Sequence, residues 1–205
     1  MFIPADQSKI NLVNDFSILI SLCEKDLNLR QELIAKGKLF GEYNPEMEAL
    51  HIENGKHLEN ILSKYGWPNE DINGQEVVAA AWTITMHAIS LPSLQKRVLA
   101  LFKKMPEYQH TPLAAMLEDR ILVFSGSKQF YGTQVDCDEK GILNPFPIQD
   151  IDKVDERRKS VNLPPLKESL DKLRARAVEE NERPPEDISE YARKRRDWMR
   201  RVGWV

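Results

Sequence analysis

The sequence has few of the residues on which disulfide and zinc frameworks depend. Only two cysteines occur among its 205 residues, Cys23 and Cys137, and they form no C-x-x-C pair. A disulfide framework or a zinc knuckle is therefore not expected, and the sequence predicts two reduced thiols.

Long hydrophobic runs are also missing. No apolar run reaches the length of about 18 residues that a membrane-spanning helix needs. The N-terminal segment MFIPADQSKI has no basic stretch followed by an apolar one. We therefore expect no signal peptide, no membrane contact and a cytoplasmic location.

Several motifs of cofactor binding and nucleophilic catalysis are absent. The sequence contains neither G-x-x-x-x-G-K-[ST] nor G-x-G-x-x-G, and no G-x-S-x-G. His51 and His57 lie about 120° apart around a helix and cannot bind one metal together. We therefore predict no cofactor and no metal, and leave open a metal held by His51, His87 and an acidic residue.

Composition favours a globular chain, with 41% hydrophobic and 30% charged residues. The net charge of −3 is uneven, because residues 190–205 carry six Lys or Arg against two acids. We expect a short basic helix packed through Trp198 and Trp204. Binding of nucleic acid by this segment is the weaker alternative.

Helical spacing of apolar residues recurs along most of the chain. In the first helix the predicted core stripe includes Leu19, Ile20, Cys23 and Leu27. Helices are predicted over residues 11–35, 45–65, 75–90, 92–105, 112–120 and 166–180, and from about 187. The segments ILVF and KQFYGTQV flank the turn SGS and predict a β-hairpin at about 121–135.

The predicted fold is mainly α, a single-domain helical bundle with five to seven helices and one small antiparallel β-hairpin. A long irregular loop follows over about 136–165, because it is rich in proline and acids. The domain is expected to span residues 1–180, and residues 181–205 form a C-terminal basic helical extension.

Polar side chains fall on the core-facing stripes of the predicted helices. His51 and Asn54 share the stripe of Met47 and Leu58, and Gln95, Arg120 and His87 lie with apolar neighbours on three further helices. A buried polar group without a partner costs about 1–3 kcal/mol. These side chains should therefore pair with one another or with a ligand.

The predicted hairpin would bring a second polar group to the first. It carries Gln129, Tyr131, Thr133 and Gln134, and Gly132 would let a backbone or ligand approach closely. We predict one concavity, with the rings of its two histidines less than about 12 Å apart. Its lining is His51, Asn54, His87, Arg120, Tyr131 and Gln134.

Structural interpretations of the same residues stay open. A single inward histidine is more often a hydrogen-bonded core residue. Asp119 and Arg120 could form an ion pair that fixes a helix end to the hairpin. The charged run over residues 154–158 is expected to be a solvated turn or helix start, from which Arg157 could reach an acidic ligand.

Five segments together resemble an uncharacterised bacterial family of unknown function, number 6624. They are YNPEMEALHIEN, YGWP, AAWTITMHAISLPSLQKRVL, LEDRILVFSGSKQFYGTQ and PIQDIDKVDERR, between about residues 24 and 166. The resemblance places the family's recurring polar positions at His51 and Asn54, at His87 and Ala88, at Asp119 and Arg120, and over residues 131–134. Met86 stands where the family usually has Gln. The resemblance implies no activity.

Two hypotheses about function follow. In the first, the chain is an enzyme acting on a small polar or anionic molecule, with catalytic residues His51, His87 and Tyr131. Its ligand-binding residues are Asn54, Gln95, Asp119, Arg120, Thr133 and Gln134. In the second, it is a non-catalytic binding or interaction module, and the polar cluster is a structural network. The sequence leaves open which holds, and also the oligomeric state.

Overall fold

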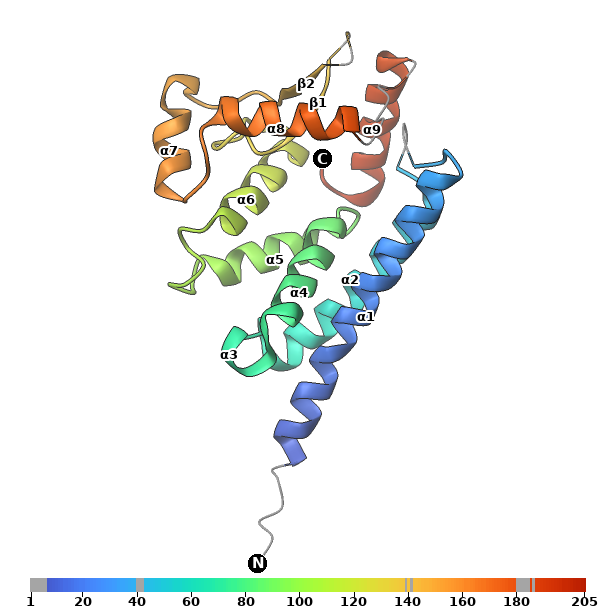
Figure 1. The fold of residues 1–205 in the computed structure, drawn as a ribbon, viewed down its shortest axis with the longest axis vertical. Helices are drawn as coiled ribbons and strands as arrows, with labels where there is room; N and C mark the ends of the chain where they lie inside the picture. Colours follow the sequence, from blue (N-terminus) through green and yellow to red (C-terminus); the bar gives the residue numbers. More distant parts are fainter. Residues whose placement is uncertain (1–6, 40–42, 139, 141, 180–184, 186) are drawn as a thin grey trace, which may run out of the picture. The chain divides into compact units, whose positions relative to one another are not determined.

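The computed structural model describes residues 7–39, 43–138, 140, 142–179, 185 and 187–205. In this part of the chain the fold is mainly α-helical, with one two-stranded antiparallel sheet (Figure 1), which confirms the predicted fold class. The elements are α1 (Gln7–Ala35), α2 (Pro45–Tyr65), α3 (Glu70–Asn73), α4 (Gln75–His87), α5 (Pro92–Phe102), α6 (Pro112–Phe124), β1 (Val135–Cys137), β2 (Leu143–Pro145), the 3-10 helix η1 (Ile151–Lys153), α7 (Val154–Ser160), α8 (Leu166–Glu179) and α9 (Ile188–Val202).

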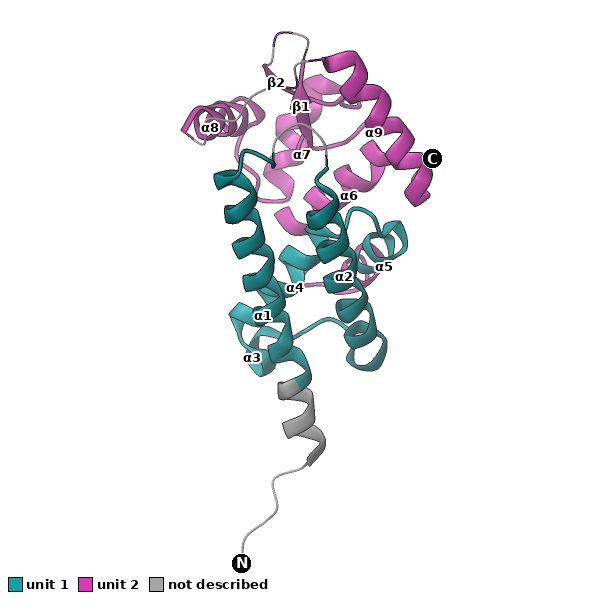
Figure 2. Cartoon of the chain, turned by 90° about the vertical axis from the view of Figure 1, so that its right-hand side faces the viewer, with its two compact units in different colours: residues 1–39, 43–98 teal, residues 40–42, 99–205 magenta. Residues whose placement is uncertain are grey.

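The chain divides into two compact units, coloured separately in Figure 2. Unit 1 comprises residues 1–39 and 43–98, and unit 2 comprises residues 40–42 and 99–205. The sequence instead suggested one domain to residue 180 with a separate extension, and that division remains a prediction.

Unit 1 is built on α2, which packs against α1 and α4. The Asn44 side chain caps the start of α2 by accepting the N–H groups of Glu46 and Met47 at 2.8 and 3.3 Å. Gly55 lies on the buried face, where a Cβ would come within 2.6 Å of Leu91 Cδ1 and 3.1 Å of Ala88 Cβ. The absence of a side chain at Gly55 therefore lets α2 approach the turn after α4 closely.

Unit 2 places its two strands after a loop that follows α6. β1 pairs with β2 in the register Val135↔Pro145 and Cys137↔Leu143. Before β1, Gln129 is fully buried and its side-chain N–H group donates to the carbonyl oxygens of Gln134 and Phe146 at 2.9 Å each. These bonds hold the loop over residues 127–134 against the sheet.

The predicted position of the hairpin was wrong. Residues 121–124 form the last turn of α6, and the Ser125 N–H donates to Ile121 O at 3.0 Å. In this turn Val123 is buried and lies one helical turn after the buried Asp119, so the continued helix keeps its inward face. Residues 128–134 form a loop, and the hairpin lies over residues 135–145.

The described part of the chain has nine α-helices, more than the five to seven predicted. The additional helices are the four-residue α3 and the seven-residue α7, in segments for which the sequence predicted no complete helix. Asn69 caps α3 through its side chain, which accepts the Ile72 N–H at 3.1 Å. In α7, Val154 and Arg158 are buried one turn apart.

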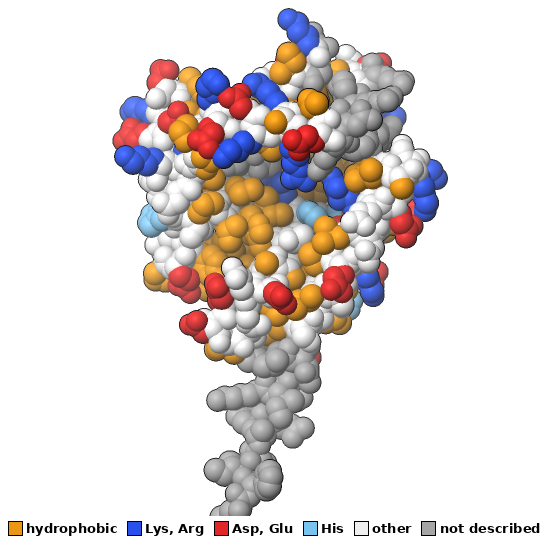
Figure 3. All heavy atoms as spheres, viewed as in Figure 1, with side chains coloured by type: hydrophobic (Ala, Val, Ile, Leu, Met, Phe, Trp, Pro, Cys, Tyr) orange, Lys and Arg blue, Asp and Glu red, His pale blue; other side chains and the backbone are white. Residues whose placement is uncertain are grey.

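The surface of α8 carries acidic and basic side chains side by side, visible along this helix in Figure 3. Lys167 pairs with Asp171 at 2.6 Å and Lys172 with Glu168 at 2.7 Å. Such exposed pairs stabilise a helix by only about 0.3–0.5 kcal/mol each. Among the described residues, none of the helices has the length and apolar character needed to cross a membrane.

We predict that Gly132→Ala destabilises unit 2 more than Gly126→Ala does. Both glycines have positive φ, 69° and 74°, so alanine costs about 1–2 kcal/mol at either position. At Gly132 a Cβ would also come within 2.7 Å of Ile148 Cδ1 and 2.9 Å of Leu166 Cδ1, whereas at Gly126 it meets nothing within 4 Å. Urea unfolding should show an additional loss of about 1–3 kcal/mol for Gly132→Ala. Equal losses in the two variants would contradict this packing.

Candidate functional site

A buried carboxylate lies at the centre of unit 1. Asp26 is 1% exposed and lies on the buried stripe of α1, seven residues after Leu19 and seven before Leu33. This spacing returns to nearly the same helix face, so the backbone aims Asp26 into the core. A carboxylate in this position needs hydrogen-bond donors or positive charge.

Two histidines meet this carboxylate. The Asp26 Oδ2 atom lies 2.7 Å from His87 Nδ1, a hydrogen bond, and 3.1 Å from His51 Nε2. The His51 contact is within ion-pair distance, but it is not aligned as a hydrogen bond. The two rings lie 4.9 Å apart between centroids, so the predicted proximity of the two histidines is confirmed.

Tyr43 extends the cluster behind His51. Its hydroxyl lies 2.6 Å from His51 Nδ1 and 3.5 Å from the backbone oxygen of His87. Tyr43, His51, Asp26 and His87 therefore form a continuous chain of polar contacts. Gly55 supports this chain, because it lies one turn after His51 and lets α2 approach the turn that follows His87.

The two histidines differ in their access to solvent. The side chain of His87 is 35% exposed, whereas that of His51 is 9% exposed. The Nε2 atom of His87 has no hydrogen-bond partner among the described residues. The His87 ring is therefore held by the hydrogen bond at Nδ1, and its Nε2 side is accessible to solvent or a ligand.

The charge state of Asp26 follows from these contacts. Burial alone would raise the pKa of Asp26, but its close contacts with His51 and His87 hold it well below its ordinary value. Asp26 is therefore ionised throughout the neutral range, and its Oδ1 atom accepts no hydrogen bond from the residues that the structure describes.

Two more predicted residues tie the helices of unit 1 together. The side-chain N–H group of Asn54 donates to Leu22 O at 3.2 Å, and that of Gln95 donates to Thr85 O at 2.8 Å. Both side chains are buried, and their amide oxygens have no hydrogen-bond partner in the part of the chain that the structure describes. These contacts are structural, and the ligand-binding roles of Asn54 and Gln95 stay predictions.

In unit 2, Asp119 organises the loop that carries the other predicted residues. Its carboxylate accepts the N–H groups of Phe130, Tyr131 and Thr133 at 2.7–3.2 Å, together with the Thr133 hydroxyl at 2.9 Å. Burial raises the pKa of Asp119, and these hydrogen bonds oppose that rise. The sequence had suggested that Arg120 forms an ion pair with Asp119, and the structure shows backbone N–H groups around this carboxylate.

Arg120 and Gln134 contact each other in the same unit. The Nε atom of Arg120 donates to Gln134 Oε1 at 3.0 Å, and the Gln134 amide donates to the Thr133 hydroxyl at 3.1 Å. Burial raises the pKa of Tyr131, whose side chain lies on this loop. Hydrogen bonds thus connect Arg120, Gln134 and Thr133, and Tyr131 belongs to the same loop as the last two.

The predicted residues therefore form two groups. His51, Asn54, His87 and Gln95 belong to unit 1, whereas Asp119, Arg120 and the loop over residues 131–134 belong to unit 2. A single concavity lined by both groups remains a prediction.

Asp26 and Tyr43 were not predicted from the sequence. A signal for Asp26 existed, because an acid with seven-residue spacing to Leu19 and Leu33 lies on their helix face. The sequence stripe instead included Leu27, whose side chain is 48% exposed. Tyr43 precedes α2 in a loop, where no periodicity marks an inward side chain.

The charged run over residues 154–158 is not fully solvated as predicted. Arg158 is 2% exposed and donates to the carbonyl oxygens of Pro164 and Tyr131 and to the Ser169 hydroxyl. Arg157 donates to the backbone oxygens of Phe130, Gln149 and Asp150. The two arginines connect α7 to neighbouring loops. The missed signal is the spacing of Val154 and Arg158, which share one helix face.

Three residues of the site are of the kind that bind metal ions. Asp26, His51 and His87 each offer a ligand atom, and these atoms all lie within 4.8 Å of one another. Carboxylate and imidazole are ligands for zinc and other divalent transition metals. This cluster corresponds to the alternative that the sequence left open, with Asp26 as the acidic residue.

We predict that Asp26 makes the stability of the protein depend on pH in the acid range. In the unfolded chain an aspartate has a pKa of about 3.9, whereas in the folded protein the pKa of Asp26 is far lower. The unfolded state therefore binds more protons below about pH 4.5, and the stabilisation by Asp26 is lost as the pH falls towards its folded pKa.

Asp26→Asn should lower the free energy of unfolding by about 1–3 kcal/mol at pH 7 and flatten its dependence on pH between about 4.5 and 2.5. Urea unfolding over this range measures both effects. Asp71→Asn, at an exposed position, is the control and should follow the wild-type curve. Parallel curves for Asp26→Asn and the wild type would show that Asp26 is not ionised in the folded protein.

Comparison with known proteins identifies the family of the chain. Searches among curated proteins and solved structures gave no match. Residues 15–178 match the Family of unknown function (DUF6624), in agreement with the resemblance noted in the sequence. These residues make up most of the chain, and the protein therefore belongs to this family.

Proposed function

We propose that the Asp26–His51–His87 cluster is the proton-transfer centre of an enzyme that acts on a small polar molecule, with His87 as its general acid or base. The observation that carries this proposal is the asymmetry of His87. Its Nδ1 atom lies 2.7 Å from an ionised carboxylate, whereas its Nε2 atom has no hydrogen-bond partner among the described residues. The His87 side chain is 35% exposed.

The role of Asp26 follows from this asymmetry. A carboxylate that accepts a hydrogen bond from the Nδ1–H group fixes the neutral imidazole in the tautomer whose Nε2 lone pair is free. It also stabilises the imidazolium that forms when Nε2 takes a proton. A general base positioned in this way typically contributes about 10²–10⁴-fold to a reaction rate.

His51 and Tyr43 support the carboxylate. His51 is 9% exposed and lies between Asp26 Oδ2 and the Tyr43 hydroxyl, at 3.1 and 2.6 Å. It is therefore a positioning residue in this proposal, although the sequence analysis assigned it a catalytic role. The roles predicted for Tyr131, Arg120 and Gln134 concern residues of unit 2 and remain predictions.

A bound divalent cation is the second candidate. It is favoured by the Asp26 Oδ1 atom, which has no hydrogen-bond partner among the described residues, and by ligand atoms within 4.8 Å of one another. The distances favour the proton-transfer centre. Two ligand atoms each about 2.0–2.1 Å from the same metal ion lie roughly 3 Å or more apart. The 2.7 Å between Asp26 Oδ2 and His87 Nδ1 is instead the length of a direct hydrogen bond.

The proposal predicts a specific pattern of histidine acylation by diethyl pyrocarbonate, which attacks the unprotonated imidazole nitrogen. His87 should react at least as fast as the exposed His110, because Asp26 leaves its Nε2 lone pair free, whereas the buried His51 should be protected. In Asp26→Asn the His87 rate should fall several-fold relative to His110. Peptide mass spectrometry measures all three rates in one sample.

One result of this experiment would support the structural-network hypothesis instead. If His87 reacted as slowly as His51 in the folded wild-type protein, the cluster would be sealed and could not exchange a proton with a substrate. An unchanged His87 rate in Asp26→Asn would show that the carboxylate does not control the ring.

We also predict that the folded protein does not depend on metal. Treatment with a chelator should leave the melting temperature unchanged, because Asp26 Oδ2 is already in direct contact with both histidines. Titration with Zn²⁺ or Mn²⁺ distinguishes the second candidate. A rise in melting temperature in the wild type that is lost in Asp26→Asn would assign the cluster to a metal ion, because a ligand specific to the native state stabilises it.

A further inference from the structure

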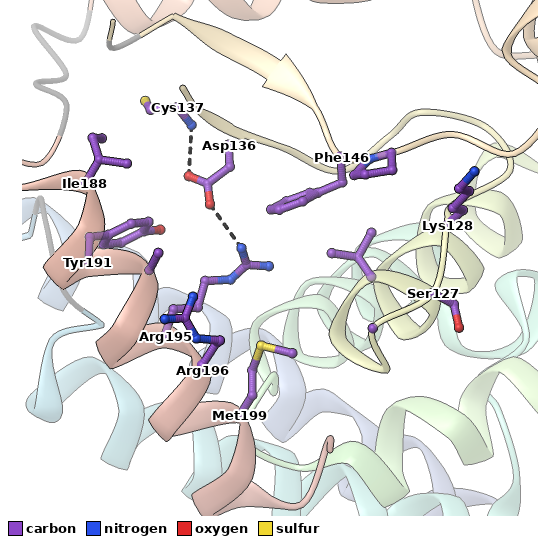
Figure 4. Close-up of a pocket in the computed structure, with 14 residues that line it drawn as sticks. Ser127, Lys128, Asp136, Cys137, Phe146, Ile188, Tyr191, Arg195, Arg196 and Met199 are labelled. Atoms are coloured by element: carbon purple, nitrogen blue, oxygen red, sulfur yellow. Dashed lines mark hydrogen bonds and ion pairs between the residues drawn. The ribbon is translucent and has the colours of Figure 1, made fainter. Parts of the chain in front are cut away.

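Unit 2 contains a pocket that lies outside the site described above. Its volume is about 520 Å³, within the range of about 300–1,000 Å³ typical of small-molecule sites. Three segments line it, namely the end of α6 with the following turn, the sheet region around β1 and β2, and one face of α9. Figure 4 shows side chains from these segments facing one another across the pocket.

The wall on the side of α9 is fixed by Arg195. Its Nη1 atom pairs with Asp136 Oδ2 at 3.1 Å, and its guanidinium carbon lies 4.4 Å from the centre of the Phe146 ring. Figure 4 shows the Arg195 side chain directed to the region between Asp136 and Phe146. The charge of Arg195 is therefore balanced by Asp136, and its guanidinium group lies over the face of the Phe146 ring.

Two further cations line the pocket without such a balance. Lys128 and Arg196 are exposed, and neither has an ion-pair partner among the described residues. With Arg195 and Asp136 neutralising each other, the charged side chains of the lining sum to an excess of two positive charges. This excess attracts an anion.

The remaining lining is largely apolar. Val123 and Met199 are buried, and Phe146, Pro147 and Ile188 complete the apolar part of the wall. An inorganic anion would leave this surface in contact with water. An organic anion would bury an apolar body against it, which is favourable.

We infer that this pocket binds a small organic anion, a carboxylate on an aromatic or aliphatic body, which is attracted by the excess positive charge of Lys128 and Arg196 on its walls. The inference does not depend on the proposed chemistry of His87, because the pocket residues all belong to unit 2. The concave shape favours a small molecule over nucleic acid, the partner considered for the basic segment in the sequence analysis.

The test uses 2-naphthoate as the probe and its uncharged amide, 2-naphthamide, as the matched ligand control, with binding to the full chain measured by titration calorimetry. Naphthoate should bind several-fold more tightly than naphthamide, and added salt should weaken only naphthoate. Lys128→Gln and Arg196→Gln should each weaken naphthoate about three-fold, as expected for a charge at a solvent-exposed site.

Two variants assign the binding to this pocket. Ala192→Phe should fill it and reduce naphthoate binding more than ten-fold while the melting temperature stays near that of the wild type. Arg193→Gln is the control on the same helix, because Arg193 pairs with Glu190 and Asp197 and does not line the pocket. It should leave naphthoate affinity unchanged.

Three results would overturn the inference. Equal affinity for naphthoate and naphthamide would remove the selectivity for anions, and equal losses in Arg193→Gln and Arg196→Gln would show binding to diffuse charge. Displacement of naphthoate by a short oligonucleotide would assign this surface to nucleic acid.

Discussion

An ionised carboxylate buried in a helical core is the constraint on which unit 1 depends. Asp26 is 1% exposed, and without hydrogen-bonding or charged partners its burial would cost several kcal/mol. Two histidines from α2 and α4 supply these partners, at 3.1 and 2.7 Å. Neighbouring residues make this contact possible. Gly55 allows α2 to approach the turn after α4 closely, and the Tyr43 hydroxyl forms a hydrogen bond with Nδ1 of His51.

Unit 2 also buries a carboxylate but satisfies it differently. Asp119 accepts three backbone N–H groups and one hydroxyl, and the nearby buried Arg158 donates to backbone oxygens and a serine. Backbone N–H groups do not act as acids or bases near neutral pH, whereas imidazoles do. The Asp119 network is therefore suited to fixing a loop, and the Asp26 cluster is suited to moving a proton.

The sequence predicted some of these features from local signals and missed others because the signals were ambiguous. The bounds of α2 followed from Pro45 and Gly66, and the spacing of polar residues on inward stripes brought His51 and His87 together. The four apolar residues at the end of α6 have no clear period, so β-branching suggested a strand where the helix continues. Asp26 was missed because a hydrophobic stripe is drawn from apolar residues and leaves charged ones out. Only the tertiary structure shows which partners offset the cost of burying its carboxylate.

The central claim is that Asp26 fixes the proton of His87 on Nδ1 and leaves Nε2 free. Long-range ¹H–¹⁵N NMR spectra of the histidine side chains test it most directly, because the two nitrogens give distinct shifts when only one carries a proton. The account predicts that neutral His87 has a protonated Nδ1 and an unprotonated Nε2, and that Asp26→Asn removes this preference. A neutral His87 protonated at Nε2 in the wild-type protein would contradict it.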